Sequence, residues 1–205
     1  MSYLGYDKIN LGSGTNCLDG FWNVDWPPGH LDGLTPRRIS ENIVYRTPDS
    51  YMDVTDLSCI PDSSFSYVRA SHILEHICIS QVRTVLKNWV RILDVGGTID
   101  IVVPDFDYLV HKYYEDSYAA IEFWEEYKNE PSLWCETIEK QPLDSKEMVL
   151  MEFIFLNGYH KSAFNFLFLK KLLTSNGIVD ISRYKDEESK KMKYDHLLRI
   201  RGIKK

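Results

Sequence analysis

The residues best suited to chemistry in this sequence are histidines and a carboxylate that follow apolar runs. His72 comes just after the run ending at Ala70, and Asp105 comes just after the β-branched run ending at Pro104. His160 lies in a glycine-containing segment, NGYHKSAF, ahead of a helical pattern. Imidazoles and carboxylates are common general bases because they can take up a proton near neutral pH. We therefore expect His160, Asp105 and His72 to be catalytic, with His160 or Asp105 as the base.

Neighbouring residues offer alternatives. Glu75 and His76 lie one turn beyond His72 and are expected to stabilise the entry to a helix, while Asp107 follows Asp105. Asp105, Asp107 and the histidines could instead bind a divalent metal. No ligand spacing defines such a site, so we predict none.

A second chemical signal is the stretch KINLGSGTNCLDGFWNVDW. A strand that runs into Gly12-Ser13-Gly14 presents backbone N–H groups at the carboxyl end of a sheet, where open α/β sheets bind ligands. Asp25 at the next strand end can accept hydrogen bonds from both ribose hydroxyls. Cys17 stands where a dinucleotide fingerprint has its third glycine, and Asp25 follows Gly12 by only 13 residues. The pattern favours a cofactor without phosphates over NAD or flavin.

Short apolar runs alternate with helical patterns, which predicts a parallel sheet flanked by helices. The expected strands are 9–11, 21–25, 51–54, 66–70 and 98–103, followed by 178–184 and 197–203 as an antiparallel edge. The fold class is thus α/β: a single Rossmann-like doubly wound sheet, mostly parallel with an antiparallel C-terminal strand. One helix is expected from an N-cap at Ser80 to a stop at Gly96-Gly97. A second spans 165–175 and stops at Gly177.

The length of 205 residues fits one domain, 1–205. Residues 26–50 are proline-rich and predict a long surface loop. Residues 106–155 predict a helical, aromatic-rich insert after the fifth strand. Aromatic faces suit sugars and other amphipathic acceptors, so we expect this insert to shape the acceptor site.

The composition of the chain limits the classes of partner and the compartment that we expect for it. The net charge of −6 disfavours a broad nucleic-acid surface, although basic residues concentrate in 185–205. Four cysteines without a CxxC pair predict reduced thiols in the cytoplasm. We expect no membrane span and no signal peptide, because no apolar run is long enough and the N-terminus lacks a basic leader.

The sequence resembles the class I S-adenosylmethionine-dependent methyltransferases, specifically the small type 11-like group. The resemblance covers most of the chain and rests on INLGSG, NVD, MDVTDL, FSYVRASHILEHI and RILDVGGTIDIVVPD. Val95 departs from the proline that often precedes the paired glycines, in a turn expected to lie far from the cofactor.

By this resemblance the cofactor is S-adenosylmethionine. The implied contacts are Gly12, Ser13 and Gly14 along its methionine part, Asp25 on the ribose, Asp53 on the adenine amino group, the Val54 backbone beside the ring, and Ser71 and His72 near the methyl group. Asp53 could also be an ordinary turn residue.

Relatives of this group are often linked to glycan synthesis, so the expected function is O-methylation of a sugar hydroxyl or similar small molecule. The alternatives are a protein, lipid-like or nucleic-acid acceptor, or a catalytically silent cofactor-binding module. A nicotinamide oxidoreductase is disfavoured by Cys17 and the short connection to Asp25.

Overall fold

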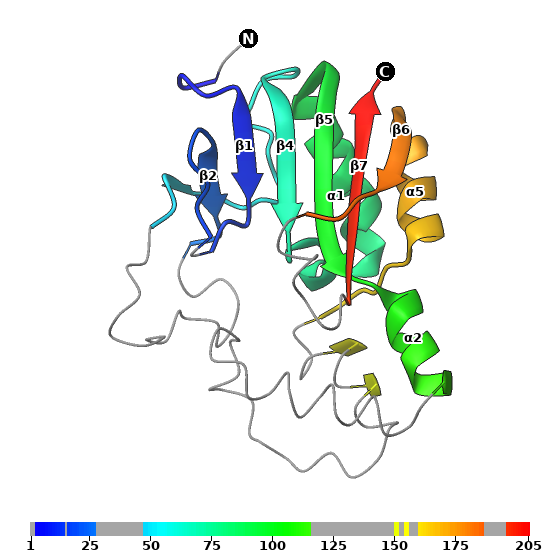
Figure 1. The fold of residues 1–205 in the computed structure, drawn as a ribbon. Coiled ribbons are helices and arrows are strands. Elements are labelled where there is room, and N and C mark those ends of the chain that lie inside the picture. The colour runs from blue at the N-terminus through cyan, green and yellow to red at the C-terminus, as the bar shows by residue number, and fades with distance from the viewer. Residues whose placement is uncertain are drawn as a thin grey trace.

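The sheet positions every candidate residue of this protein. The computed structural model describes residues 3–14, 16–27, 47–115, 150–151, 154–155, 160–186 and 196–205. Within them, seven strands form one sheet in the order β3-β2-β1-β4-β5-β7-β6 (Figure 1). The strands are β1 (Lys8–Leu11), β2 (Trp22–Asp25), β3 (Ser50–Tyr51), β4 (Phe65–Ser71), β5 (Leu93–Pro104), β6 (Ile178–Arg183) and β7 (Leu197–Lys204). β7 runs antiparallel to both neighbours and all other pairs are parallel, which confirms the expected fold class.

Two helices pack on the sheet, α1 (Ile79–Ile92) and α5 (Phe166–Thr174). Each buries the apolar side chains that recur at three- and four-residue spacing, including Leu86 and Trp89 in α1 and Leu169 in α5. The helices contact one another and lie on the same side of the sheet (Figure 1). Two further elements follow strands: η1 (Leu74–His76) after β4 and α2 (Phe106–Glu115) after β5.

The two faces of the sheet differ in chemistry, because successive side chains of a strand point to opposite faces. Ile9, Val68 and Ile99 pair across β1, β4 and β5, and all three are completely buried on the apolar face. One residue further along, Arg69 and Asp100 pair on the opposite, polar face. Among the described residues, α1 and α5 therefore cover the apolar face only.

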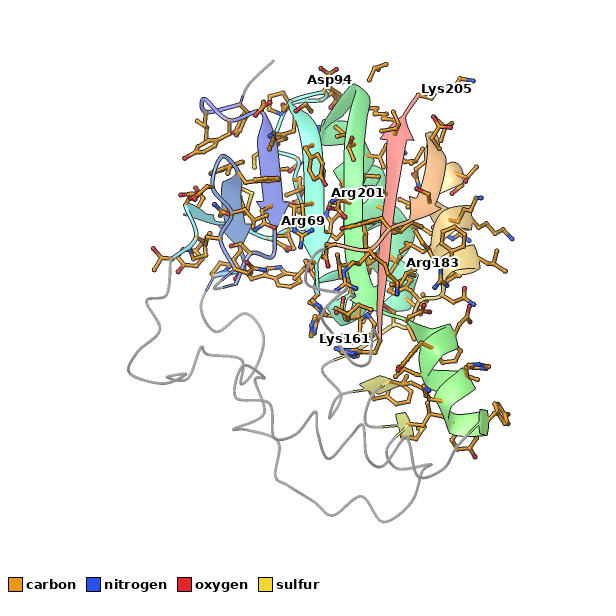
Figure 2. All side chains as sticks on the ribbon, viewed as in Figure 1. Arg69, Asp94, Lys161, Arg183, Arg201 and Lys205 are labelled. Carbon is orange, nitrogen blue, oxygen red and sulfur yellow. The ribbon has the colours of Figure 1, made fainter. Side chains whose placement is uncertain are left out.

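A buried carboxylate organises the polar face. Asp100 has no exposed surface and accepts hydrogen bonds from the Tyr67 and Tyr184 hydroxyls at 2.7 and 2.6 Å. Arg69 and Arg201 form ion pairs with it at 3.1 and 3.2 Å (Figure 2). Burial and the charge of Asp100 raise the pKa of Tyr184 to about 12. The carboxylate is thus fully hydrogen-bonded and joins β4, β5 and β7 to the segment after β6.

Three local expectations are wrong in detail. α1 begins after Cys78, so Ser80 is not its N-cap, and it ends at Ile92 rather than at the paired glycines. Gly96-Gly97 instead lies in an irregularity of β5, whose pairing with β4 jumps from Leu93 to Thr98. β3 is only Ser50–Tyr51 because the chain turns at Asp53.

Much of two expected segments lies outside the described residues. These are the proline-rich loop, of which 28–46 are not described, and the insert, of which α2 is the main described part. The acceptor-shaping role of 106–155 stays a prediction. Residues 187–195, part of the stretch 185–205 where basic residues concentrate, also lie outside the described residues. No described helix is both long enough and apolar enough to cross a membrane.

The Asp100 network leads to a stability prediction. Asp100→Asn should lower the free energy of unfolding by about 3 kcal/mol, because it removes the buried charge that two arginines share. The matched control is Asp180→Asn: Asp180 is exposed, and Asn tolerates its φ of 51°. Urea denaturation measures both, and the control should change by no more than about 0.5 kcal/mol. Equal losses for the two variants would contradict the role given to Asp100.

Candidate active site

The glycine loop lies at the edge where β1, β2, β4 and β5 end, which we call the carboxyl edge. Gly12 and Gly14 adopt φ of 64° and 51°, and the Ser13 amide donates to the Val24 carbonyl at 3.0 Å. A Cβ on Gly12 would lie 2.6 Å from Ile73 Cδ1. The loop is therefore folded against the segment that follows β4, where Ser71 is the last strand residue.

Asp25 closes the loop from the adjacent strand. Its Oδ2 accepts from the Gly14 amide at 2.9 Å and its Oδ1 from the Trp26 amide at 2.8 Å. Burial raises the pKa of this carboxyl group, and the two backbone hydrogen bonds oppose the rise. Each oxygen has further acceptor capacity, so the group fits the pair of hydroxyls on a ribose.

Trp26, the residue after Asp25, contacts the turn that contains Asp53 and Val54. The Trp26 indole N–H donates to Asp53 Oδ1 at 3.1 Å, and Thr55 donates to the same oxygen through its amide and hydroxyl at 2.8 and 2.6 Å. The Val54 carbonyl accepts from the Trp89 indole at 2.8 Å. Asp53 thus caps a turn at the carboxyl edge, and its contact with adenine stays a prediction.

Two buried amides that the sequence analysis missed hold the connection from β1 to β2. Asn10 Nδ2 donates to Asn23 Oδ1 at 3.1 Å and to the Asn16 carbonyl at 3.0 Å. Asn23 Oδ1 accepts from the Leu18 amide at 2.7 Å, and its Nδ2 donates to Asp49 Oδ2 at 3.0 Å. These bonds satisfy backbone groups of a connection too short for a long helix. The sequence signal for these two residues was an asparagine inside each of two otherwise mostly apolar strands, which indicates a buried polar contact.

The third part of the site is a group of four side chains, His72, Glu75, His76 and His160, which we call the histidine cluster. His72 Nδ1 lies 3.3 Å from Glu75 Oε1, and the His72 side chain is 49% exposed whereas that of Glu75 is 2% exposed. The rings of His76 and His160 meet edge to face, with centroids 5.0 Å apart.

Backbone hydrogen bonds bring His160 to this place. The Glu75 carbonyl accepts from the Lys161 and Ser162 amides at 2.7 and 3.1 Å. These bonds fasten the segment after His160 to η1 at the carboxyl edge, where Figure 2 shows Lys161. The cluster therefore depends on a tertiary contact between distant parts of the chain.

The charges in the cluster are set by burial and by one another. Burial acts to raise the pKa of Glu75, but the contact with His72 and the nearby imidazoles outweigh it and hold that pKa below its ordinary value. Burial lowers the pKa of His160, and the charge of Glu75 opposes this only in part. Glu75 is therefore a carboxylate and His160 is neutral at pH 7.

His72 has an unusual backbone. Its φ is 54°, in the left-handed region, and its amide donates to the Val102 carbonyl at 2.9 Å. Such strain in a residue other than glycine costs roughly 1–2 kcal/mol and is found most often at functional sites. The turn places the imidazole at the carboxyl edge, one residue from the Ile73 that packs on the glycine loop.

Asp105, which we expect from the sequence to be a catalytic base, is engaged in an ion pair. Its side chain is 6% exposed, and its Oδ2 forms an ion pair with Arg183 Nη1 at 2.7 Å. Its Oδ1 accepts from the Asp107 amide at 3.2 Å, and Asp107 Oδ1 in turn accepts from Asn165 Nδ2 at 2.9 Å. In this arrangement Asp105 links the end of β5 to β6.

A pocket lies between the histidine cluster and the start of the insert. It has apolar walls and a polar edge, and its lining includes Glu75, Pro104, Phe106, Leu109, His160 and Phe164. Its volume of about 10 Å³ admits one water-sized group, so the pocket is a small indentation beside the cluster.

No protein-family model and no curated protein matches the sequence. Solved structures do match. One is an S-adenosylmethionine-dependent methyltransferase from Archaeoglobus fulgidus, with a TM-score of 0.55 at 14% identity over 98% of this chain and 87% of that one. Another is a possible histamine N-methyltransferase from Thermotoga maritima, with a TM-score of 0.51 at 15% identity over 97% and 82%. A third, an O-methyltransferase family protein from Burkholderia thailandensis, has a TM-score of 0.52 at 10% identity over 97% and 51%.

These matches establish the fold. The chain has the class I fold found in S-adenosylmethionine-dependent methyltransferases, which confirms the resemblance stated from the sequence at the level of architecture.

The contact between Gly12 and Ile73 leads to a second prediction. Gly12→Ala should cost about 1–2 kcal/mol for the left-handed backbone and about 1–3 kcal/mol more for overpacking against Ile73. Gly20→Ala is the matched control, because Gly20 also has a positive φ of 76° but nothing within 4 Å of its Cβ position. Urea denaturation should show the larger loss for Gly12→Ala. A loss no larger than that of the control would mean that the loop does not depend on this contact.

Proposed function

We propose that this chain is an S-adenosylmethionine-dependent methyltransferase that methylates a hydroxyl group of a sugar or a similar small molecule. The observation that carries the proposal is the placement of His72. Its ring is paired with the buried carboxylate of Glu75 and stands at the carboxyl edge beside the glycine loop. The fold supports the class of reaction, and the arrangement of this site supports a hydroxyl acceptor.

The cofactor assignment is supported by the groups around the glycine loop. Gly12, Ser13 and Gly14 offer a close approach to backbone, and Asp25 offers a carboxylate that suits ribose hydroxyls. The described residues of the loop, 12–14 and 16–21, form no cradle of amides at the start of a long helix, which a pyrophosphate would need. When bound, S-adenosylmethionine supplies an electrophilic methyl group on its sulfonium sulfur.

His72 is the general base that the structure favours. The Glu75 carboxylate, 3.3 Å from Nδ1, favours electrostatically the tautomer with its proton on Nδ1, which leaves Nε2 as the acceptor nitrogen. In the transfer, the new O–CH3 bond forms as the S–CH3 bond breaks, and the hydroxyl proton passes to His72 Nε2. The products are a methyl ether and S-adenosylhomocysteine. Glu75 orients the ring and stabilises the imidazolium that results.

The mouth of the pocket beside the cluster is the proposed acceptor site. Phe106 supplies an aromatic face, and Ser162 and His160 supply polar groups at its edge. Aromatic faces with polar neighbours suit a sugar ring, which has both apolar C–H faces and hydroxyls. Asp105, engaged with Arg183, supports this pocket by holding β5 to β6.

A catalytically silent cofactor-binding module remains the alternative from a different class. It would keep the glycine loop and Asp25 but would have no use for a strained, half-exposed histidine paired with a buried carboxylate. Measurement of methyl transfer distinguishes the methyltransferase from the silent module.

Cofactor binding is tested by thermal unfolding with S-adenosylmethionine, S-adenosylhomocysteine and NAD, each added separately. A ligand at 100 times its dissociation constant stabilises the folded state by about 2.7 kcal/mol, which for a chain of this size raises Tm by roughly 5–10 °C. Both adenosyl ligands should give this shift, NAD should give none, and Asp25→Ala should lose most of it. A shift with NAD alone would show that the site is a dinucleotide site.

Turnover is tested with methyl-labelled S-adenosylmethionine and a panel of nucleotide sugars and methyl glycosides. His72→Ala should lower turnover by roughly 10²–10⁴-fold on an accepted substrate, which is the usual contribution of a general base. Added imidazole should restore part of the rate, because the His72 side chain is half-exposed. The Tm shift with S-adenosylhomocysteine should remain that of the wild type. Unchanged turnover in His72→Ala would eliminate this base, and no turnover of any acceptor by the wild type would favour the silent module.

A further inference from the structure

We propose that Glu75, His76 and His160 form a binding site for a divalent transition-metal ion of the zinc class. One ligand atom from each of these side chains lies within 4.8 Å of the others. We call the three the Glu75 triad. This proposal departs from the expectation from sequence, which predicted no metal site.

The buried carboxylate is the first observation that points to a ligand. The Glu75 side chain is 2% exposed, and neither of its oxygens accepts a hydrogen bond within the described residues. His72 Nδ1 approaches Oε1 at 3.3 Å but does not have hydrogen-bond geometry. A buried carboxylate without donors is costly, and a coordinated cation removes that cost.

The donor set is the second observation. Two imidazole nitrogens and one carboxylate oxygen match the preferences of zinc and its neighbours, whereas magnesium and calcium prefer oxygen ligands alone. Bonds of about 2.1 Å in tetrahedral geometry place two ligands of one ion about 3.4 Å apart. The ligand atoms of the triad, which lie within 4.8 Å of one another, therefore move together by up to about 1.4 Å when they close on an ion.

The surroundings hold the triad in place. Glu75 and His76 are adjacent in η1, and His160 is fixed beside them because the Lys161 and Ser162 amides bind the Glu75 carbonyl. Ser162 Oγ also donates to the Leu74 carbonyl at 3.2 Å. Two segments far apart in sequence thus present their ligands to one point. Rigid support of this kind is what a metal site requires.

Three protein ligands leave a coordination position open, as in catalytic zinc sites. Glu75 and His160 both line the pocket described above, so the open position faces the proposed acceptor site. A hydroxyl bound there becomes more acidic before its proton passes to His72. This use rests on the proposed function, whereas binding of the ion does not.

The test uses the full chain stripped with a chelator and titrated with ZnCl2 in a calorimeter. Cobalt(II) absorption in the visible range then reports a low-coordinate site. The wild type should bind one ion per chain, and His76→Asn and His160→Asn should each lower the affinity at least tenfold. Glu75→Gln should do the same, and its thermal unfolding shows whether it still folds.

Two matched controls separate this site from adventitious binding. Cys78→Ser removes an exposed thiol close to η1, and His111→Asn removes an exposed histidine on α2. Both should bind zinc as the wild type does. Saturable binding that survives both histidine changes, or that disappears with Cys78→Ser, would overturn the proposal, as would no binding at one ion per chain.

Turnover and cofactor binding are measured on the same samples. The shift in Tm with S-adenosylhomocysteine should be present with and without zinc, so failure of the metal proposal leaves the cofactor assignment intact. Loss of turnover on chelation, with recovery on adding zinc, supports the catalytic use of the ion. Turnover that is the same with and without zinc overturns that use and leaves zinc binding to be judged by the calorimetric titration.

Discussion

Ile73 occupies the space into which a side chain at position 12 would project, and the rest of the site depends on that contact. Because only glycine allows the approach, the loop after β1 packs directly on the segment after β4. Asp25 then reaches the loop from β2, and His72 stands one residue before Ile73. Asp25, the glycine loop and His72 are thereby gathered at one edge of the sheet.

In this chain, hydrogen bonds of polar side chains hold a connection between strands that a helix provides in many α/β proteins. The connection between β1 and β2 is held by the amides of Asn10 and Asn23. On the same polar face, Asp100 collects two tyrosines and two arginines around a buried charge. Such networks are stable only when every member is satisfied, because an unpaired buried charge is expensive.

The histidine cluster also contains a buried carboxylate, but its partners are of a different kind. Glu75 is as deeply buried as Asp100, yet it faces imidazoles in place of tyrosines and arginines. Imidazoles can hold a proton, transfer one or bind a metal, whereas the partners of Asp100 are fixed donors. The partners of these two buried carboxylates therefore differ in the chemistry they could perform.

The sequence by itself determined the order of strands and helices, the glycine loop, the position of Asp25 and the class of fold. These depend on short-range patterns: alternation in strands, three- and four-residue spacing in helices, and the freedom of glycine. Element boundaries were less predictable, as the start of α1 at Ile79 and the early start of β5 show.

Only the tertiary structure decided which candidate side chains meet. It paired Asp105 with Arg183 and joined His160 to Glu75 and His76, through backbone hydrogen bonds between η1 and the segment after residue 160. No local pattern encodes those contacts, because they depend on where the sheet brings two distant segments together. Burial lowers the pKa of His160, and the nearby imidazoles hold the pKa of Glu75 below its ordinary value. Both effects likewise arise only once the chain is folded.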